Sequence, residues 1–243
     1  NDILKACQEA GIAPDFISWH GYAKDPMQYA NEADLARKLC DGYGFPKCEL
    51  ILNEWHYLTD NKWDHLWTKA DPEVFYHAYV GPASQGGIDS AAFTLTVESR
   101  FQDTCLDQSY FYGCGFGWDN WGYYDVHARK LNKTYYAMQI MGEVVKGGKE
   151  KVACTSSVKA VTPFAAVSAD SKRAYVAVAD YKSGKEQLEI RFANLAGFRL
   201  SHVRILDWDR DLERMDVRMS DDGVLRLPKA TSRSACFLIE LEK

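Results

Sequence analysis

The sequence lacks a surplus of charge of either sign, and it lacks long apolar runs. Its 243 residues carry 29 Lys and Arg against 34 Asp and Glu, for a net charge of −5. A dedicated nucleic-acid binder needs a basic surplus, so we expect no nucleic-acid partner. No apolar run reaches the roughly 18 residues of a membrane-spanning helix, and we expect no membrane partner. The apolar share of 47% is ordinary for a globular protein of one or two domains.

Several catalytic and metal-binding signatures are also missing. The sequence has no Cys-x-x-Cys pair, no Gly-x-Ser-x-Gly elbow and no P-loop, which removes support for a zinc ribbon or a serine hydrolase. The cysteines number seven, too few for a disulfide scaffold, and Cys105 and Cys114 are either bridged or buried thiols. His56, Asp64 and His65 are close in sequence but lack a regular ligand spacing. We therefore expect neither a metal ion nor a cofactor.

The first ten residues do not have the pattern of a signal peptide, because they carry acidic groups and no unbroken apolar stretch. Ile3, Leu4 and Cys7 repeat at helical spacing before Gly11, so the chain begins inside a helix. We expect the sequence to be a processed product or a fragment, and its cellular location stays open.

Residues 1–147 alternate between predicted strands and helices, which is typical of an α/β fold with a parallel sheet. The strand starts are spaced close to the roughly 31 residues per unit of a (β/α)8 TIM barrel. A doubly wound sheet has similar spacing, but no glycine-rich phosphate turn follows any of these strands. The predicted strands span residues 15–22, 49–57 and 88–97, and the predicted helices span 27–40, 73–84 and 130–145.

Polar and ionisable residues occupy the carboxyl ends of all three predicted strands, which is where barrel enzymes build their sites. Three strands do not close a barrel. We therefore expect the last three strand-helix units here and about five preceding strands in a part of the protein outside this sequence. The strand-end residues are His20 and Tyr22, then Asn53, Glu54 and His56, and finally Glu98.

Residues 148–243 have a different pattern, with short alternating runs separated by turn clusters. This pattern is typical of an antiparallel β-sandwich. Nothing in this region has a catalytic pattern, so we assign it as an accessory domain. The predicted strands include residues 174–179, 187–192, 201–206 and 236–241.

Glu54 is the strongest catalytic candidate. It follows an apolar strand and precedes Trp55, so its carboxylate would lie beside aromatic side chains, as a nucleophile that attacks a sugar requires. A strand-end Glu paired with Lys or Arg is the alternative. His20 and Tyr22 alternate on the neighbouring strand and would both point toward Glu54. The Tyr22 hydroxyl could orient the carboxylate, while His20 could bind sugar hydroxyls or be an ordinary half-buried histidine.

Two segments make the assignment more specific: Asp15-Phe-Ile-Ser-Trp-His-Gly-Tyr22 and Leu50-Ile-Leu-Asn-Glu-Trp-His-Tyr57. Together they resemble the sixth and seventh strands of glycoside hydrolase family 39 and its relatives in clan A, which are retaining (β/α)8 enzymes. The resemblance implies that Glu54 is the nucleophile and that His20 and Tyr22 form the His-x-Tyr element. Residues 122–137 resemble the segment after the eighth strand, and a following β-sandwich also suits the family.

The family's general acid/base lies in an Asn-Glu-Pro motif, which this chain does not contain. The second carboxylate therefore lies outside the chain unless Glu98 substitutes for it. An ion pair with Arg100 is the alternative role for Glu98. Trp118 and Trp121 are candidates for stacking on a sugar, and the alternative is that they pack a long loop against the fold.

The sequence thus predicts the carboxy-terminal portion of a retaining glycoside hydrolase. Residues 1–147 would belong to the catalytic barrel and residues 148–243 to the β-sandwich. Glu54 would be catalytic, and the other candidates would bind the carbohydrate substrate. The missing amino-terminal barrel portion would be the structural partner, and the chain alone would be inactive. A non-catalytic carbohydrate-binding or structural module is the alternative. The candidate substrate-binding residues are His20, Tyr22, Trp55, Glu98, Trp118 and Trp121.

Overall fold

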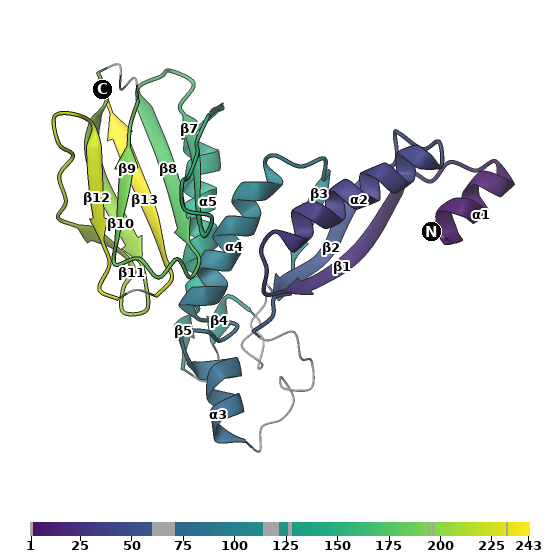
Figure 1. The fold of residues 1–243 in the computed structure, drawn as a ribbon, viewed down its shortest axis with the longest axis horizontal. Coiled ribbons are helices and arrows are strands. Elements are labelled where there is room, and N and C mark those ends of the chain that lie inside the picture. The colour runs from purple at the N-terminus through teal and green to yellow at the C-terminus, as the bar shows by residue number, and fades with distance from the viewer. Residues whose placement is uncertain are drawn as a thin grey trace.

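A computed structural model describes residues 2–59, 71–113, 122–125, 128–193, 195, 197–231 and 233–243. The fold is mixed α/β, as predicted. A three-stranded parallel sheet with its helices lies at one end of the molecule and an antiparallel β region lies at the other, with α4 and α5 between them (Figure 1). Cys114 lies outside the described residues, so the possible bridge from Cys105 does too.

The parallel sheet has the order β1-β2-β3. Its strands are β1 (Phe16–Ala23), β2 (Glu49–Tyr57) and β3 (Gln108–Phe111). Helix α1 (Asp2–Ala10) precedes the sheet, and α2 (Gln28–Gly42) connects β1 to β2. Leu50 and Leu52 alternate along β2 and are fully buried on the helix side of the sheet. This alternation sends the residues between them to the opposite face.

The predicted strand at residues 88–97 is wrong, because these residues belong to helix α4 (Ile88–Phe101). The helix is buried on two sides: Phe93 and Val97 pack toward the parallel sheet, and Ala91 and Leu95 pack toward the antiparallel region. A helix covered on two sides has a nearly continuous apolar sequence, which periodicity does not distinguish from a buried strand. The third parallel strand is instead β3, in a segment where no strand was predicted.

The remaining helices are α3 (Pro72–Phe75), the π-helix η2 (Tyr76–Val80) and α5 (Lys133–Gly147). The predicted helix at 73–84 is therefore shorter than expected and changes to π geometry halfway. A small hairpin, β4 (Tyr124–Asp125) and β5 (Lys130–Leu131), precedes α5. Among the residues that the structure describes, no helix has the length and apolar character needed to span a membrane.

The antiparallel region contains a six-stranded sheet of order β11-β10-β13-β8-β7-β6 and a two-stranded sheet, β12-β9. In chain order the strands are β6 (Glu150–Val152), β7 (Val161–Val167), β8 (Arg173–Asp180), β9 (Gln187–Arg191), β10 (Arg199–Leu206), β11 (Asp211–Met215), β12 (Val224–Pro228) and β13 (Ala235–Glu242).

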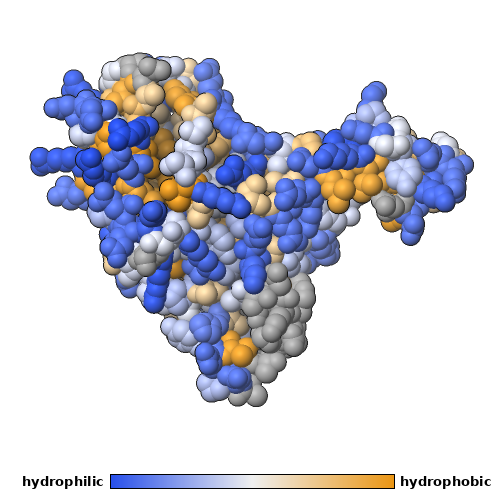
Figure 2. Space-filling view, viewed as in Figure 1, coloured by the Kyte–Doolittle hydropathy of each residue, from blue (hydrophilic) through white to orange (hydrophobic). Residues whose placement is uncertain are grey.

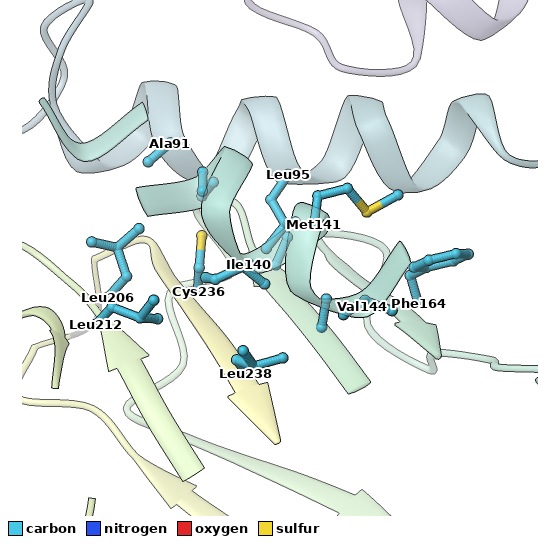
Figure 3. Close-up of a cluster of buried hydrophobic side chains, with 14 of the residues drawn as sticks. Ala91, Leu95, Ile140, Met141, Val144, Phe164, Leu206, Leu212, Cys236 and Leu238 are labelled. Carbon is cyan, nitrogen blue, oxygen red and sulfur yellow. The ribbon is translucent and has the colours of Figure 1, made fainter. Parts of the chain in front are cut away.

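Both faces of the six-stranded sheet are covered. Along β13, Cys236 and Leu238 face α4 and α5, whereas Phe237 and Ile239 face the β9-β12 pair. Figure 3 shows the first of these cores, in which side chains of the two helices meet those of the sheet. Figure 2 shows hydrophobic side chains among the antiparallel strands at the left of the view, over the second core. The shared core of α4, α5 and the sheet joins the two regions of the chain.

The carboxyl group of Glu98 belongs to helix α4, and burial raises its pKa to about 7. The native state therefore holds a proton that the unfolded chain releases near pH 4.3. We expect the free energy of unfolding to fall by about 1 to 3 kcal/mol between about pH 4.5 and 7 and to level off above that range. Glu98→Gln should remove this loss, so urea unfolding at several pH values should give a flatter profile. If the pH profiles of Glu98→Gln and the parent had the same slope, the expectation would be contradicted. Glu186→Gln, which changes an exposed carboxylate, is the control and should have the profile of the parent.

Candidate functional site

The site lies at the carboxyl ends of β1 and β2, where their parallel register sets His20 beside Glu54 and Tyr22 beside His56. The Tyr22 hydroxyl donates a hydrogen bond to Oε1 of Glu54. The Nδ1 atom of His20 lies 3.6 Å from the same oxygen. The Glu54 side chain is 26% exposed, so a molecule in solvent can reach the carboxylate.

The phenol is a suitable donor at this position. Burial and the adjoining Glu54 carboxylate both raise the pKa of Tyr22, so its hydroxyl keeps its proton. The bond holds one carboxylate oxygen in place. Within the described residues, neither oxygen of Glu54 is paired with a Lys or an Arg. The alternative of a strand-end ion pair with a basic side chain therefore has no support in this part of the chain.

Tyr29 of α2 fastens the backbone of both strands beneath these side chains. Its hydroxyl oxygen lies 2.8 Å from the carbonyl oxygen of His56 and 3.0 Å from that of Gly21, and its single hydrogen is shared between these two acceptors. The ring is fully buried, and it packs against Gly21 so closely that an added Cβ would lie 2.4 Å from Tyr29 Cε1. Gly21 separates His20 from Tyr22, so its lack of a side chain lets the helix approach the strand that carries both candidates.

We expect Gly21→Ala to lower the free energy of unfolding by about 1 to 3 kcal/mol, because the methyl group overpacks the Tyr29 ring. Urea unfolding of the purified variant measures the loss. Gly142→Ala is the matched control, since an added Cβ in α5 meets nothing within 4 Å. That substitution should be neutral or stabilise the helix by up to about 1 kcal/mol. Equal stability of Gly21→Ala and the parent would show that the contact with Tyr29 relaxes without cost.

Trp55 does not join the site, which corrects the sequence-based expectation. Its side chain is fully buried among Tyr29, Phe101 and Phe111 on the helix side of the sheet. Consecutive strand residues point to opposite faces, so the residue that follows Glu54 points away from it. Trp55 is therefore a core residue of the described part of the chain.

Glu98 also lies away from Glu54, because it belongs to α4 and not to a strand end. Phe93 and Phe101 of this helix pack on Tyr57 and Trp55, which alternate with Glu54 and lie on the opposite face of the sheet. Glu98 follows Ala91 and Leu95 on the face toward the antiparallel region. No ion pair between Glu98 and Arg100 occurs among the described residues, so the expected partner is absent there as well.

Four residues named in the sequence analysis are not placed by the structure. Trp118 and Trp121 lie outside the described residues, as do Asp64 and His65 of the weak metal pattern. Among the residues that are described, no group of three or more His, Cys, Asp and Glu side chains is positioned to hold a metal ion.

Sequence reasoning missed Tyr112, which follows β3 and lies beside the site. Its ring packs edge-on against Tyr22, with the ring centroids 6.1 Å apart. Its backbone N–H donates to the carbonyl oxygen of Trp55 at 2.9 Å, which extends the sheet by one residue. The alternation of Gln108, Tyr110 and Tyr112 was a usable signal, but the third strand was sought at residues 88–97.

The π-helix η2 also packs beside Tyr22. Tyr22 and Tyr79 both pack against the buried residues Leu58 and Ala78. Because η2 follows β2 in the chain, the segment after Glu54 folds back beside the phenol that binds it. The site therefore combines an accessible carboxylate, an imidazole and several tyrosines within one rim of the parallel sheet.

Comparison with known proteins finds a similar fold in solved glycosidase structures. No protein-family model matches the chain, and no curated protein matches it by sequence. Solved structures do match. A glucosidase from Croceicoccus marinus aligns with 100% of the chain at a TM-score of 0.69 and 18% identity, and a monomeric beta-xylosidase from Caulobacter crescentus aligns with 99% at 0.64 and 15%. An alpha-L-arabinofuranosidase from Thermotoga maritima aligns with 99% at a TM-score of 0.57 and 16% identity.

The chain covers 56%, 58% and 55% of these three proteins, respectively. It therefore spans a little over half the length of each. At such low identity the likeness concerns the fold alone. The chain has a fold similar to about half of each of these three glycosidase structures.

Proposed function

We propose that this chain is the carboxy-terminal part of a retaining glycoside hydrolase of the family 39 type. The observation that carries the proposal is the pairing of Glu54 with Tyr22 and His20 at the carboxyl ends of two adjacent parallel strands. An accessible carboxylate whose orientation is held by a phenol suits a nucleophile. A nearby imidazole suits recognition of sugar hydroxyls.

In the proposed reaction, a carboxylate oxygen of Glu54 attacks the anomeric carbon as the bond to the leaving oxygen breaks. A second carboxylic acid protonates that oxygen, and this group lies outside the described residues of the chain. Water, deprotonated by the same second group, then cleaves the glycosyl ester. The sugar leaves with its original anomeric configuration and Glu54 is regenerated.

The proposal includes a barrel completed by preceding strands. In the described residues, β1 and β3 each have a neighbour on one edge only. Phe16 and Tyr110 are 54% and 53% exposed, and strand alternation directs them to the sheet face opposite α2. In a closed barrel this face would become the interior. Residues 1–147 would then form the end of the barrel and residues 148–243 the accessory domain.

A non-catalytic carbohydrate-binding module is the rival proposal, since Tyr110 and Tyr112 offer exposed aromatic faces for a sugar. A panel of aryl glycosides, assayed with the full-length protein that contains this chain, separates the two. We expect hydrolysis of at least one pyranoside or furanoside, with retention of configuration in the first product seen by proton NMR. Saturable sugar binding without hydrolysis would favour the rival, and inversion would contradict the role given to Glu54.

A further inference from the structure

The turn between β8 and β9 reaches from the antiparallel region to both strands of the candidate site. The Tyr181 hydroxyl donates to the carbonyl oxygen of Lys24 at 2.7 Å, one residue past the end of β1. The Lys182 Nζ donates to the Tyr57 hydroxyl at 3.3 Å, at the last residue of β2. Two consecutive residues of the turn therefore hold the two strand ends that follow Tyr22 and Glu54.

This turn is itself fixed to the antiparallel region. Asp180 is fully buried and accepts hydrogen bonds from the backbone and side chain of Ser183, at 3.0 and 2.7 Å. The Lys182 N–H donates to the Ser234 hydroxyl at 3.2 Å. Lys182 has a φ of 61°, in the left-handed region that non-glycine residues seldom adopt. The surrounding contacts hold this conformation and direct the Lys182 side chain toward the parallel sheet.

Lys182 also meets a charge at the start of α4. Its Nζ lies 3.2 Å from Oδ2 of Asp89, and the other carboxylate oxygen accepts a hydrogen bond from Ser234 at 2.6 Å. Asp89 lies in the first turn of the helix, where a negative charge is favourable. The ammonium group is also 5.6 Å from the centre of the Tyr57 ring and 4.9 Å from that of Tyr181. The ammonium therefore ties β2, α4 and the turn together.

We propose that Tyr181 and Lys182 are positioning residues for the candidate site. Through them, the antiparallel region fixes the position of the Glu54 carboxylate relative to the Tyr22 hydroxyl. Tyr57 lies three residues after Glu54, and Lys24 lies two residues after Tyr22. A shift of either strand end moves the carboxylate relative to the phenol. The catalytic part of this inference rests on the proposed function, whereas the structural part concerns the Tyr22–Glu54 pair itself.

The test uses the full-length protein with tyrosine labelled by carbon-13 at Cζ, whose resonance responds to hydrogen bonding of the hydroxyl. Tyr22→Phe assigns the Tyr22 signal. Lys182→Met and Tyr181→Phe should each move this signal by more than its line width in the folded protein. Lys182→Arg should restore it, because Arg retains a cation within reach of Asp89. Lys185→Met, an exposed lysine of the same turn, should leave it unchanged.

On any glycoside that the parent protein hydrolyses, kcat should fall about 10-fold to 100-fold in Lys182→Met, with KM changed less than about threefold. An unchanged Tyr22 signal in both Lys182→Met and Tyr181→Phe would overturn the inference whether or not the protein is a glycosidase. A parent protein without hydrolytic activity would instead contradict the proposed function. The two failures are therefore distinguishable.

Discussion

Glu54→Gln is expected to lower kcat of the full-length protein by about 10³-fold or more on any glycoside that it hydrolyses. The amide has almost the shape of the carboxylate, and its oxygen still accepts the hydrogen bond from Tyr22. It has no negative charge, however, and does not form the glycosyl ester. The thermal midpoint and the affinity for sugar should therefore stay close to those of the parent, while turnover is lost.

Glu49→Gln is the matched control for this change. Glu49 is an exposed carboxylate at the other end of the same strand, so its neutralisation alters the same net charge without touching the site. Its kcat should equal that of the parent. If Glu54→Gln retained activity comparable to Glu49→Gln, Glu54 would not be the nucleophile and the mechanism would need another carboxylate.

Lys229→Met is expected to destabilise the antiparallel region by about 3 to 5 kcal/mol, the usual cost of removing one partner of a buried ion pair. The Nζ of Lys229 lies 2.6 Å from Oδ2 of Asp180, and the two side chains are 1% and 0% exposed. Lys229 also donates to the carbonyl oxygen of Arg233 at 2.8 Å. Without the ammonium group, the buried Asp180 carboxylate loses its ion-pair partner and, among the described residues, retains the hydrogen bonds from Ser183.

Urea unfolding of Lys229→Met, Asp180→Asn and the double variant measures this interaction as a double-mutant cycle. The double variant should be more stable than Lys229→Met alone, because Asp180→Asn removes the uncompensated charge. The exposed Lys185→Met controls for loss of a positive charge from the same region. A loss below about 1 kcal/mol in Lys229→Met would mean that Asp180 takes up a proton or that water enters the core.

Regular alternation allowed the sequence to predict the strands that carry the site. The predicted strand at 49–57 coincides with β2, and the one at 15–22 differs from β1 by one residue at each end. Both strands have helices on one face and an exposed opposite face, which produces a clear period of two. The sequence also predicts strands at β8 and β13, because each contains a long run of β-branched and apolar residues.

Residues 88–101 show where local patterns stop being informative. This helix lies between two β structures, so almost every position is buried and no polar face marks its period. β3 was not predicted for the opposite reason: it has only four residues, and none of them is fully buried. β7 contains Pro163, which argues against a strand when only the sequence is known. Tertiary contacts decide the structure of all three segments.

The site residues that follow from strand alternation could be predicted, whereas those that depend on tertiary contacts could not. His20, Tyr22 and Glu54 could be assembled because parallel neighbours bring strand ends together. Trp55 was assigned to the site by adjacency in sequence, although alternation directs it to the core. Tyr112 contacts Tyr22, which lies 90 residues earlier in the chain. Lys182 contacts Tyr57, which lies 125 residues earlier. The alternation at residues 108–112 can indicate a strand, but a local pattern does not specify which distant residue that strand or the turn at Lys182 contacts.

In the proposed mechanism, the Glu54 carboxylate forms a covalent bond to a sugar. A 2-fluoro glycoside with a good leaving group traps such an intermediate, because the fluorine slows hydrolysis of the glycosyl ester more than its formation. After reaction with the full-length protein, peptide mass spectrometry should locate one 2-fluoroglycosyl group on Glu54 and none in Glu54→Gln. A label on a different carboxylate, or rapid turnover of ordinary glycosides with an unmodified Glu54, would contradict the account.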